Sequence, residues 1–215
     1  MKITGNILIS INININIIII GNPILITVPS GDKAIALDGV DQALNFGDQT
    51  FRCLGDVEKC SLGLTISFNI KIKEKKDNCF IMSSGGEEGD SYGIAMWIYR
   101  GKLYSRVSTK KYEWTVYTKD FEVDEYFGCK MSWSKQYGLS FYKNKKHKKT
   151  SRKHKKRKGS KSRKDKFYIG RSMKGGVHHC KMEIDGFTTV DASEEVVEEI
   201  DVPYGKSNIK ISPHN

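Results

Sequence analysis

The stretch LTISFNIKI, residues 64–72, decides the fold of this chain. Apolar residues occupy every second position from Leu64 to Ile72, and Thr, Ser, Asn and Lys occupy the positions between them. Because successive side chains of a β-strand point to opposite faces, this alternation predicts a long strand with one face buried and the other in water.

Shorter stretches with the same period follow this strand. Turns rich in Gly, Asp, Asn and Lys separate them, and they cover residues 93–99, 103–107, 112–118, 127–133 and 139–142. Short alternating strands with almost no helical periodicity predict an all-β fold, a two-sheet antiparallel sandwich of the jelly-roll type. One short C-terminal helix is expected at SEEVVEEI, residues 193–200, because Asp191 or Ser193 can cap its first turn.

Three regions are expected along the chain: residues 1–29, a sandwich domain at 33–200, and a tail or linker at 201–215. The first region is a low-complexity run of Ile and Asn. It resembles an atypical signal peptide because Lys2 precedes an apolar stretch, although asparagines interrupt that stretch; an extension without structure and a real β-strand are the alternatives. No apolar run approaches the roughly 20 residues that cross a bilayer, so no membrane span is expected.

The positive charge is concentrated in one insert, KNKKHKKTSRKHKKRKGSKSRKDK, residues 143–166. It holds 15 Lys or Arg and one acid, a local charge of +14 in a chain whose total is +11, so the other residues sum to about −3. The sequence therefore indicates a mildly acidic domain with a polybasic insert, which self-repulsion and the lack of apolar residues should keep as a disordered loop.

Clustered cations release condensed counterions when they approach a polyanion, so the insert predicts salt-sensitive binding to sulfated glycosaminoglycan or nucleic acid. The alternative is a solvated loop that has no partner. The candidate polyanion-binding residues are Lys145, Lys146, Lys148, Lys149, Arg152, Lys153, Lys155, Lys156, Arg157, Lys158, Lys161, Arg163 and Lys164.

Five cysteines leave at least one without a partner in the chain. Cys53 and Cys60 enclose the six residues LGDVEK, a plausible span for a local disulfide and an indication of an oxidising compartment; two free thiols in a cytosolic protein are the alternative. At most two of Cys79, Cys129 and Cys180 can pair, and the sequence does not choose between them.

Sequence blocks along residues 33–200 resemble, in order, a laminin-G-like, concanavalin-A-type jelly roll, as found in pentraxin-, polycystin- and adhesion-receptor-type ectodomains. The blocks are KAIALDGVDQALNFGD, GLTISFNIKI, FIMSSGG, GIAMWIY, GKLYSRV, YFGCKMSW, GLSFYKNKK, KFYIGRS, MEIDGFTTVDAS and SEEVVEEI. The resemblance implies an extracellular recognition module in which the Cys53/Cys60 loop is disulfide-closed. This sequence departs from the family at Asn69, where the family often carries Trp, and at the polybasic insert, which replaces a short turn.

This framework could carry a catalytic site, a calcium site or a sugar-stacking site. A glycoside hydrolase needs two opposed carboxylates, and no strand carries such a cluster. Asp90, Asp120 and Asp124 are weak candidates for a calcium site, because nothing in the sequence fixes their spacing. No cofactor is predicted. Aromatic residues can stack on sugars or fill the core; those in question are Trp97, Tyr99, Tyr112, Trp114 and Tyr117.

The sequence therefore predicts a non-catalytic extracellular recognition or adhesion module for glycan or protein ligands, with the polybasic insert contacting sulfated glycosaminoglycans. An intracellular polyanion binder that uses the same cations for RNA is the alternative, and a glycoside hydrolase of the same fold is the third hypothesis.

Overall fold

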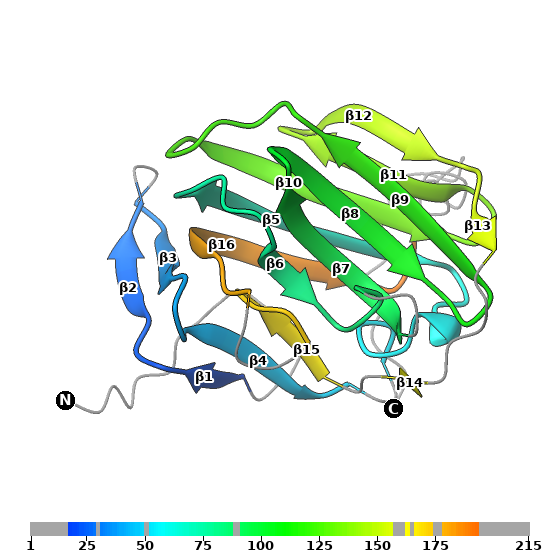
Figure 1. Cartoon of the computed structure of the whole chain (residues 1–215), viewed down its shortest axis with the longest axis horizontal. Helices are drawn as coiled ribbons and strands as arrows, with labels where there is room; N and C mark the ends of the chain where they lie inside the picture. Colours follow the sequence, from blue (N-terminus) through cyan, green and yellow to red (C-terminus); the bar gives the residue numbers. More distant parts are fainter. Residues whose placement is uncertain are drawn as a thin grey trace, which may run out of the picture.

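The computed structural model describes residues 17–28, 31–49, 52–87, 91–156, 162–163, 166–173 and 178–193. In these residues two sheets pack face to face (Figure 1). Sheet A has the order β1 (Ile18–Ile20), β4 (Ala43–Asp48), β15 (Lys166–Ile169), β6 (Cys79–Ser83), β7 (Ser91–Tyr99), β8 (Lys102–Ser108), β9 (Tyr112–Thr118) and β13 (Lys155–Lys156).

Sheet B has the order β12 (Lys146–Ser151), β11 (Gly138–Lys143), β10 (Tyr126–Ser134), β5 (Leu64–Ile72), β16 (Lys181–Val190), β3 (Lys33–Asp38) and β2 (Ile24–Thr27). Neighbours in both sheets are antiparallel, and a two-residue strand, β14 (Ser162–Arg163), pairs in parallel with the start of β7. A single turn of 3-10 helix, η1 (Val57–Lys59), precedes β5. The predicted two-sheet antiparallel sandwich is confirmed, whereas the expected helix falls almost wholly outside the described residues.

Two strands come from the Ile-rich N-terminal region that was expected to lie outside the domain. β1 pairs with β4 at one edge of sheet A, and β2 pairs with β3 at the edge of sheet B (Figure 1). The sandwich therefore includes residues before Lys33. Their β-branched isoleucines favour an extended backbone, which suits edge strands. Among the described residues no helix is long and apolar enough to cross a membrane.

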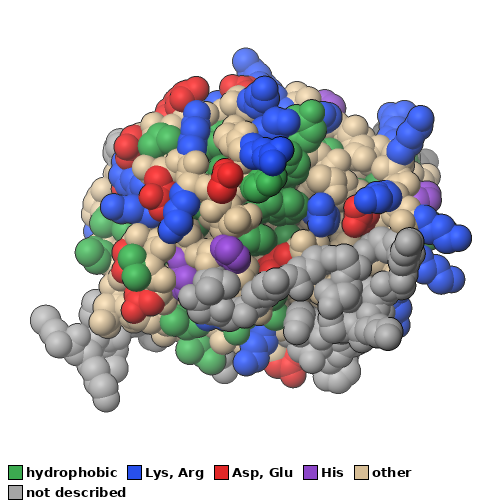
Figure 2. Space-filling model, in the orientation of Figure 1, with side chains coloured by type: hydrophobic (Ala, Val, Ile, Leu, Met, Phe, Trp, Pro, Cys, Tyr) green, Lys and Arg blue, Asp and Glu red, His purple; other side chains and the backbone are tan. Residues whose placement is uncertain are grey.

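The first half of the polybasic insert is not the disordered loop that its charge predicts. β12 continues sheet B beside β11, and β13 continues sheet A beside β9. Figure 2 shows Lys and Arg side chains on the side of the molecule where these two strands lie. An edge strand tolerates such a composition because its side chains stay in water while its backbone pairs on one side only.

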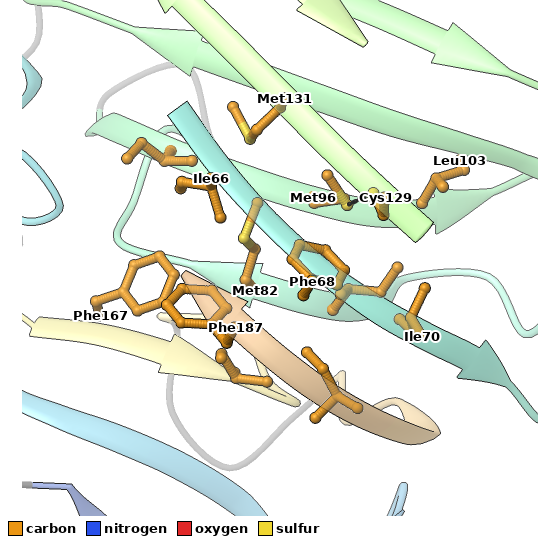
Figure 3. Packing of buried hydrophobic residues seen from close by; sticks show 14 of the residues in the cluster. Ile66, Phe68, Ile70, Met82, Met96, Leu103, Cys129, Met131, Phe167 and Phe187 are labelled. Atoms are coloured by element: carbon orange, nitrogen blue, oxygen red, sulfur yellow. Dashed lines mark hydrogen bonds between the residues drawn. The ribbon is translucent and has the colours of Figure 1, made fainter. Parts of the chain in front are cut away.

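The core lies between the sheets and uses the alternation of β5. The apolar residues of β5 are at most 3% exposed, and they face side chains of β6, β7 and β8 (Figure 3). Phe46, Phe167 and Phe187 form an aromatic cluster at the β4–β15 side, with ring centres 5.2–5.7 Å apart. Burial of this continuous apolar layer is the main favourable contribution to the fold.

Two disulfides join segments of the sandwich. Cys53 is bonded to Cys60 in the loop before β5, the pair that the sequence singles out. The second disulfide joins Cys79 on β6 to Cys180, which precedes β16 on the opposite sheet. Cys129 is the remaining cysteine; its thiol is buried beside Met96, and burial raises its pKa (Figure 3).

Candidate functional site: a basic edge across both sheets

Exposed cations line one side of the sandwich, where the chain crosses from the edge of sheet B to the edge of sheet A. We call this surface the basic edge. Its members are Lys145, Lys146, Lys148, Lys149, Arg152, Lys153, Lys155 and Lys156, all of them exposed. The structure thus brings together eight of the sequence-predicted residues on ordered backbone.

The turn between β11 and β12 sets the start of the basic edge. Asn144 and Lys145 both have positive φ, 50° and 64°, the backbone of a two-residue hairpin turn for which Asn is favoured. The Oδ1 atom of Asn144 accepts a hydrogen bond from the backbone N–H of Gly128 at 2.8 Å, which ties the turn to β10. Further along, the hydroxyls of Ser140 and Thr150 share a 2.8 Å hydrogen bond that fixes β12 against β11.

Acids neutralise only part of this charge. Asp120 forms ion pairs with Lys148 at 2.7 Å and with Lys143, just before the turn, at 3.3 Å. Hydrogen bonds from Lys148 and then Lys143 hold the pKa of Asp120 below its ordinary value. Lys155 reaches Glu113 only at 4.0 Å.

The other cations of the basic edge have no ion pair with any acid in the part of the chain that the structure describes. They are Lys145, Lys146, Lys149, Arg152, Lys153 and Lys156. Of these six, Lys146 and Lys149 belong to β12 and Lys156 to β13, while Lys145 lies in the turn before β12 and Arg152 and Lys153 lie between the two strands. The basic edge is therefore a row of exposed cations, most of which lack an ion pair with a described acid.

A row of aromatic rings crosses the outer face of sheet A and ends at the basic edge. The rings belong to Phe80, Trp97, Tyr104 and Tyr117, with centres 5.2–5.9 Å apart. Figure 2 shows hydrophobic side chains crossing this face over β7 to β9, with Lys and Arg beside them. Lys149 caps the row, because its Nζ atom lies 4.0 Å from the centre of the Tyr117 ring.

Neighbouring groups already contact the rings of this row. The ring planes of Trp97 and Tyr104 are 14° apart with centres at 5.2 Å, so these two rings stack on each other. Trp114 is 3% exposed and packs edge-on against Trp133 in the core. Tyr112 packs edge-on against His154, and this contact anchors the segment between β12 and β13.

Of the remaining predicted residues, the described acids Asp120 and Asp124 contact different lysines. Asp124 pairs with Lys73 at 3.0 Å, away from Asp120, and Asp90 lies outside the described residues. No group of three or more His, Cys, Asp or Glu suited to a metal ion occurs among the residues described. Arg163 belongs to β14, while Arg157, Lys158, Lys161 and Lys164 also lie outside the described residues.

Sequence reasoning missed a polar cluster on the outer face of sheet B. Glu183 forms ion pairs with Lys73 at 2.6 Å and with Lys71 at 3.3 Å, and the hydroxyl of Tyr126 donates a hydrogen bond to it. Burial alone would raise the pKa of Glu183, but the bonds from Lys73, Tyr126 and Lys71 outweigh it and lower the pKa. The polar residues that alternate along β5 and β16 were the available signal.

No protein-family profile matches the chain, and no curated protein matches it in sequence. Solved structures do match its fold. The receptor-binding domain of a botulinum neurotoxin C/D mosaic serotype aligns with 88% of this chain and 46% of its own, with a TM-score of 0.60 and 12% identity.

Two related structures carry ligands. The botulinum neurotoxin serotype D ligand-binding domain in complex with N-acetylneuraminic acid has a TM-score of 0.58, 11% identity, and coverage of 87% of this chain and 45% of its own. The binding domain of botulinum neurotoxin DC in complex with rat synaptotagmin II has a TM-score of 0.57, 14% identity, and coverage of 86% and 45%. The chain spans less than half of these domains, and at this identity the likeness shows that it shares their β-sandwich fold.

Proposed function

We propose that this protein is a non-catalytic extracellular recognition module that binds sulfated glycosaminoglycans or similar acidic glycans through the basic edge. The observation that carries the proposal is the row of exposed cations, most of them without an ion pair to a described acid, that β12, β13 and the residues beside them place along one side of both sheets. We retain the laminin-G-like relationship within this proposal, supported by the two-sheet sandwich.

Charge on ordered strands favours binding in two ways. Each cation that approaches a sulfate or carboxylate releases condensed counterions, which is an entropic gain at low salt. Because hydrogen bonds to β11 and β9 already order the backbone, less chain entropy is lost on binding than for a free tail.

Two observations favour an acidic glycan over RNA. Sequence-tolerant binding of single-stranded nucleic acid uses aromatic faces for base stacking, and in this protein neighbouring rings and Lys149 occupy the faces of the aromatic row. The disulfides Cys53–Cys60 and Cys79–Cys180 are the kind of bond that persists in oxidising compartments, where acidic glycans are displayed.

The surroundings of Glu183, the most buried carboxylate of sheet B, argue against the glycoside hydrolase hypothesis. Glu183 is occupied by two lysines and Tyr126, and its pKa is lowered, the opposite of what a general acid needs. The complexes of the similar neurotoxin domains with N-acetylneuraminic acid and with synaptotagmin support binding as the use of this fold.

Chromatography on immobilised heparin with a sodium chloride gradient tests the proposal. The variant Lys149→Gln/Lys153→Gln/Lys156→Gln should elute at clearly lower salt than the native protein. The matched control Lys33→Gln/Lys76→Gln/Lys181→Gln removes the same charge from exposed positions elsewhere and should elute close to the native protein.

Two results would contradict the proposal. One is equal elution of the two triple variants, since bulk charge rather than the basic edge would then explain retention. The other result concerns competition for the native protein bound to the heparin column. If poly(U) RNA displaces it at a lower concentration of phosphate groups than the concentration of sulfate groups that soluble heparin needs, the RNA hypothesis is favoured.

A further inference from the structure

Sheet B carries a pocket on its outer face that the basic edge does not use. Its volume is about 230 Å³, and its lining comes from β10, β5, β16 and the ends of two turns. The lining residues are Val28, Asn69, Tyr126, Phe127, Gly128, Asn144 and Asp185.

The floor of the pocket is a row of paired residues across three strands. Gly128 on β10 pairs with Asn69 on β5, and Asn69 pairs with Asp185 on β16. A Cβ atom at Gly128 would lie 3.5 Å from Asn69 Oδ1, and one at Gly186 would lie 3.5 Å from Asn69 Nδ2. Neither glycine therefore places a side chain against the Asn69 amide, and Gly128, which lines the pocket, leaves its floor open.

The polar groups of the floor retain hydrogen-bonding capacity. Asn69 Nδ2 is the one described donor to the Asp185 carboxylate, at a long 3.4 Å. Asn144 uses its Oδ1 atom to accept from Gly128, which leaves its amide N–H groups available. The pocket thus offers a carboxylate acceptor beside two amide side chains, a set that can both accept from and donate to hydroxyls.

The environment of Asp185 differs from that of Glu183, two residues earlier on the same strand. Glu183 is saturated by Lys71, Lys73 and Tyr126, whereas Asp185 is partly buried with a single weak donor. Burial raises the pKa of Asp185, and the nearby charge of Asp32 adds to this effect. A ligand hydroxyl would supply the hydrogen bond that the protein does not, and a half-buried acceptor gains from it.

Apolar surface completes the pocket. Tyr126 forms one wall, with Lys71 Nζ 4.9 Å from its ring centre, and Val28 and Phe127 add aliphatic and aromatic contacts. Apolar walls with a few convergent polar groups are typical of sites for small organic ligands. A sugar ring fits such a pocket because it combines C–H faces with vicinal hydroxyls. The negative charge of the Asp185 carboxylate disfavours an anionic sugar.

We propose that this pocket binds one neutral sugar ring, with Asp185 accepting hydroxyl hydrogen bonds and the Asn69 and Asn144 amides completing the contacts. The site does not depend on the function proposed for the basic edge.

The test is a titration of ¹⁵N-labelled protein with the methyl glycosides of glucose, galactose, mannose and N-acetylglucosamine, in buffer that contains EDTA. At least one glycoside should shift the backbone amides of Gly128 and Asn69 in a saturable way. The variants Gly128→Val, which fills the floor, and Asp185→Asn, which removes the charge of the acceptor, should each weaken that binding by about tenfold or more.

Controls separate this site from the basic edge. Val190→Ala changes an exposed position of β16 outside the pocket and should leave glycoside binding unchanged. The triple variant Lys149→Gln/Lys153→Gln/Lys156→Gln should also bind the glycoside normally, while Gly128→Val should elute normally from heparin. Gly128→Ala serves if the valine variant fails to fold.

The proposal is overturned if no glycoside shifts these amides. It is also overturned if the folded Gly128 and Asp185 variants bind as the native protein does, or if binding appears only after calcium replaces the chelator.

Discussion

The carboxylate of Asp120 lies 2.7 Å from the ammonium nitrogen of Lys148 on β12. Asp120 stands in the segment between β9 and β10, so this ion pair ties the polybasic strand to the body of the sandwich. It also cancels the charge of Lys148 within the basic edge, and the same carboxylate reaches Lys143 just before the turn.

The first prediction concerns this ion pair. Asp120→Asn should raise the salt concentration at which the protein elutes from heparin, because it frees Lys148 and Lys143 for a polyanion. Asp124→Asn makes the same change of net charge beside Lys73, away from the basic edge, and is the control. A shift of the same size for both variants would indicate that net charge alone decides retention.

The second prediction compares the two disulfides. Cys79 and Cys180 are 101 residues apart, whereas Cys53 and Cys60 are seven apart. A crosslink that closes a longer loop restricts the unfolded chain more. Removing Cys79–Cys180 should therefore lower the free energy of unfolding by about 4–5 kcal/mol, and removing Cys53–Cys60 should lower it by about 2–3 kcal/mol. Urea unfolding of the two double Cys→Ala variants measures both, and the reverse order would contradict the entropic argument.

The third prediction concerns Cys129. Because burial raises the pKa of its thiol, native protein at pH 8 should react with a thiol reagent such as Ellman's far more slowly than a model thiol does. After unfolding in guanidinium without reductant, one thiol per chain should react at once. More than one would show that a disulfide is absent, and fast reaction of native protein would show that the thiol is accessible.

The fourth prediction concerns Glu183 and pH. Its folded pKa is lowered, so its contribution to stability is present above its unfolded pKa of about 4.3 and is lost as the pH falls through the lower folded value. Glu183→Gln should lower the free energy of unfolding by about 1–2 kcal/mol at pH 7, since it breaks ion pairs with two partly exposed lysines. Urea unfolding at pH 7 and pH 2.5 should show this difference shrinking in acid; a constant difference would contradict the assignment.

The fifth prediction has the opposite sign at Asp185. Its folded pKa is raised, so ionisation opposes folding as the pH rises through that value. Asp185→Asn should therefore raise the urea midpoint at pH 7, and the gain should vanish below the unfolded pKa of about 3.9. A variant that is destabilised at pH 7 would show that the Asn69 contact outweighs burial.

The alternation of apolar residues predicted six of the strands that form the core, whereas β3, β4, β6, β15 and β16 were indicated only by the family resemblance. β5 and β9 have the predicted limits, and β7, β8, β10 and β11 differ by one or two residues at their ends. This accuracy has a physical basis, because a strand with one face in the core must keep its period of two or bury polar groups. The all-β sandwich followed from these strands together.

Features without such a period were not predictable. β12 has no apolar face, and its conformation depends on hydrogen bonds to β11 and on the ion pair of Lys148 with Asp120, neither of which a period of apolar residues reveals. The pairing of Cys79 with Cys180 depends on how the sheets stack, which spacing does not reveal. The sheet B pocket depends on Gly128 of β10, and only the register aligns this glycine with Asn69 on the neighbouring strand β5.

The location of β12 and β13 makes the charge distribution of the molecule uneven. Both strands lie on the side of the sandwich opposite to β1 and β2, so the cations of the basic edge gather at one end of the strand order in each sheet. Near a flat acidic layer, attraction of these cations would turn this side of the domain toward the layer. In that orientation the isoleucines of β1 and β2 lie on the side away from the layer and stay accessible from solution.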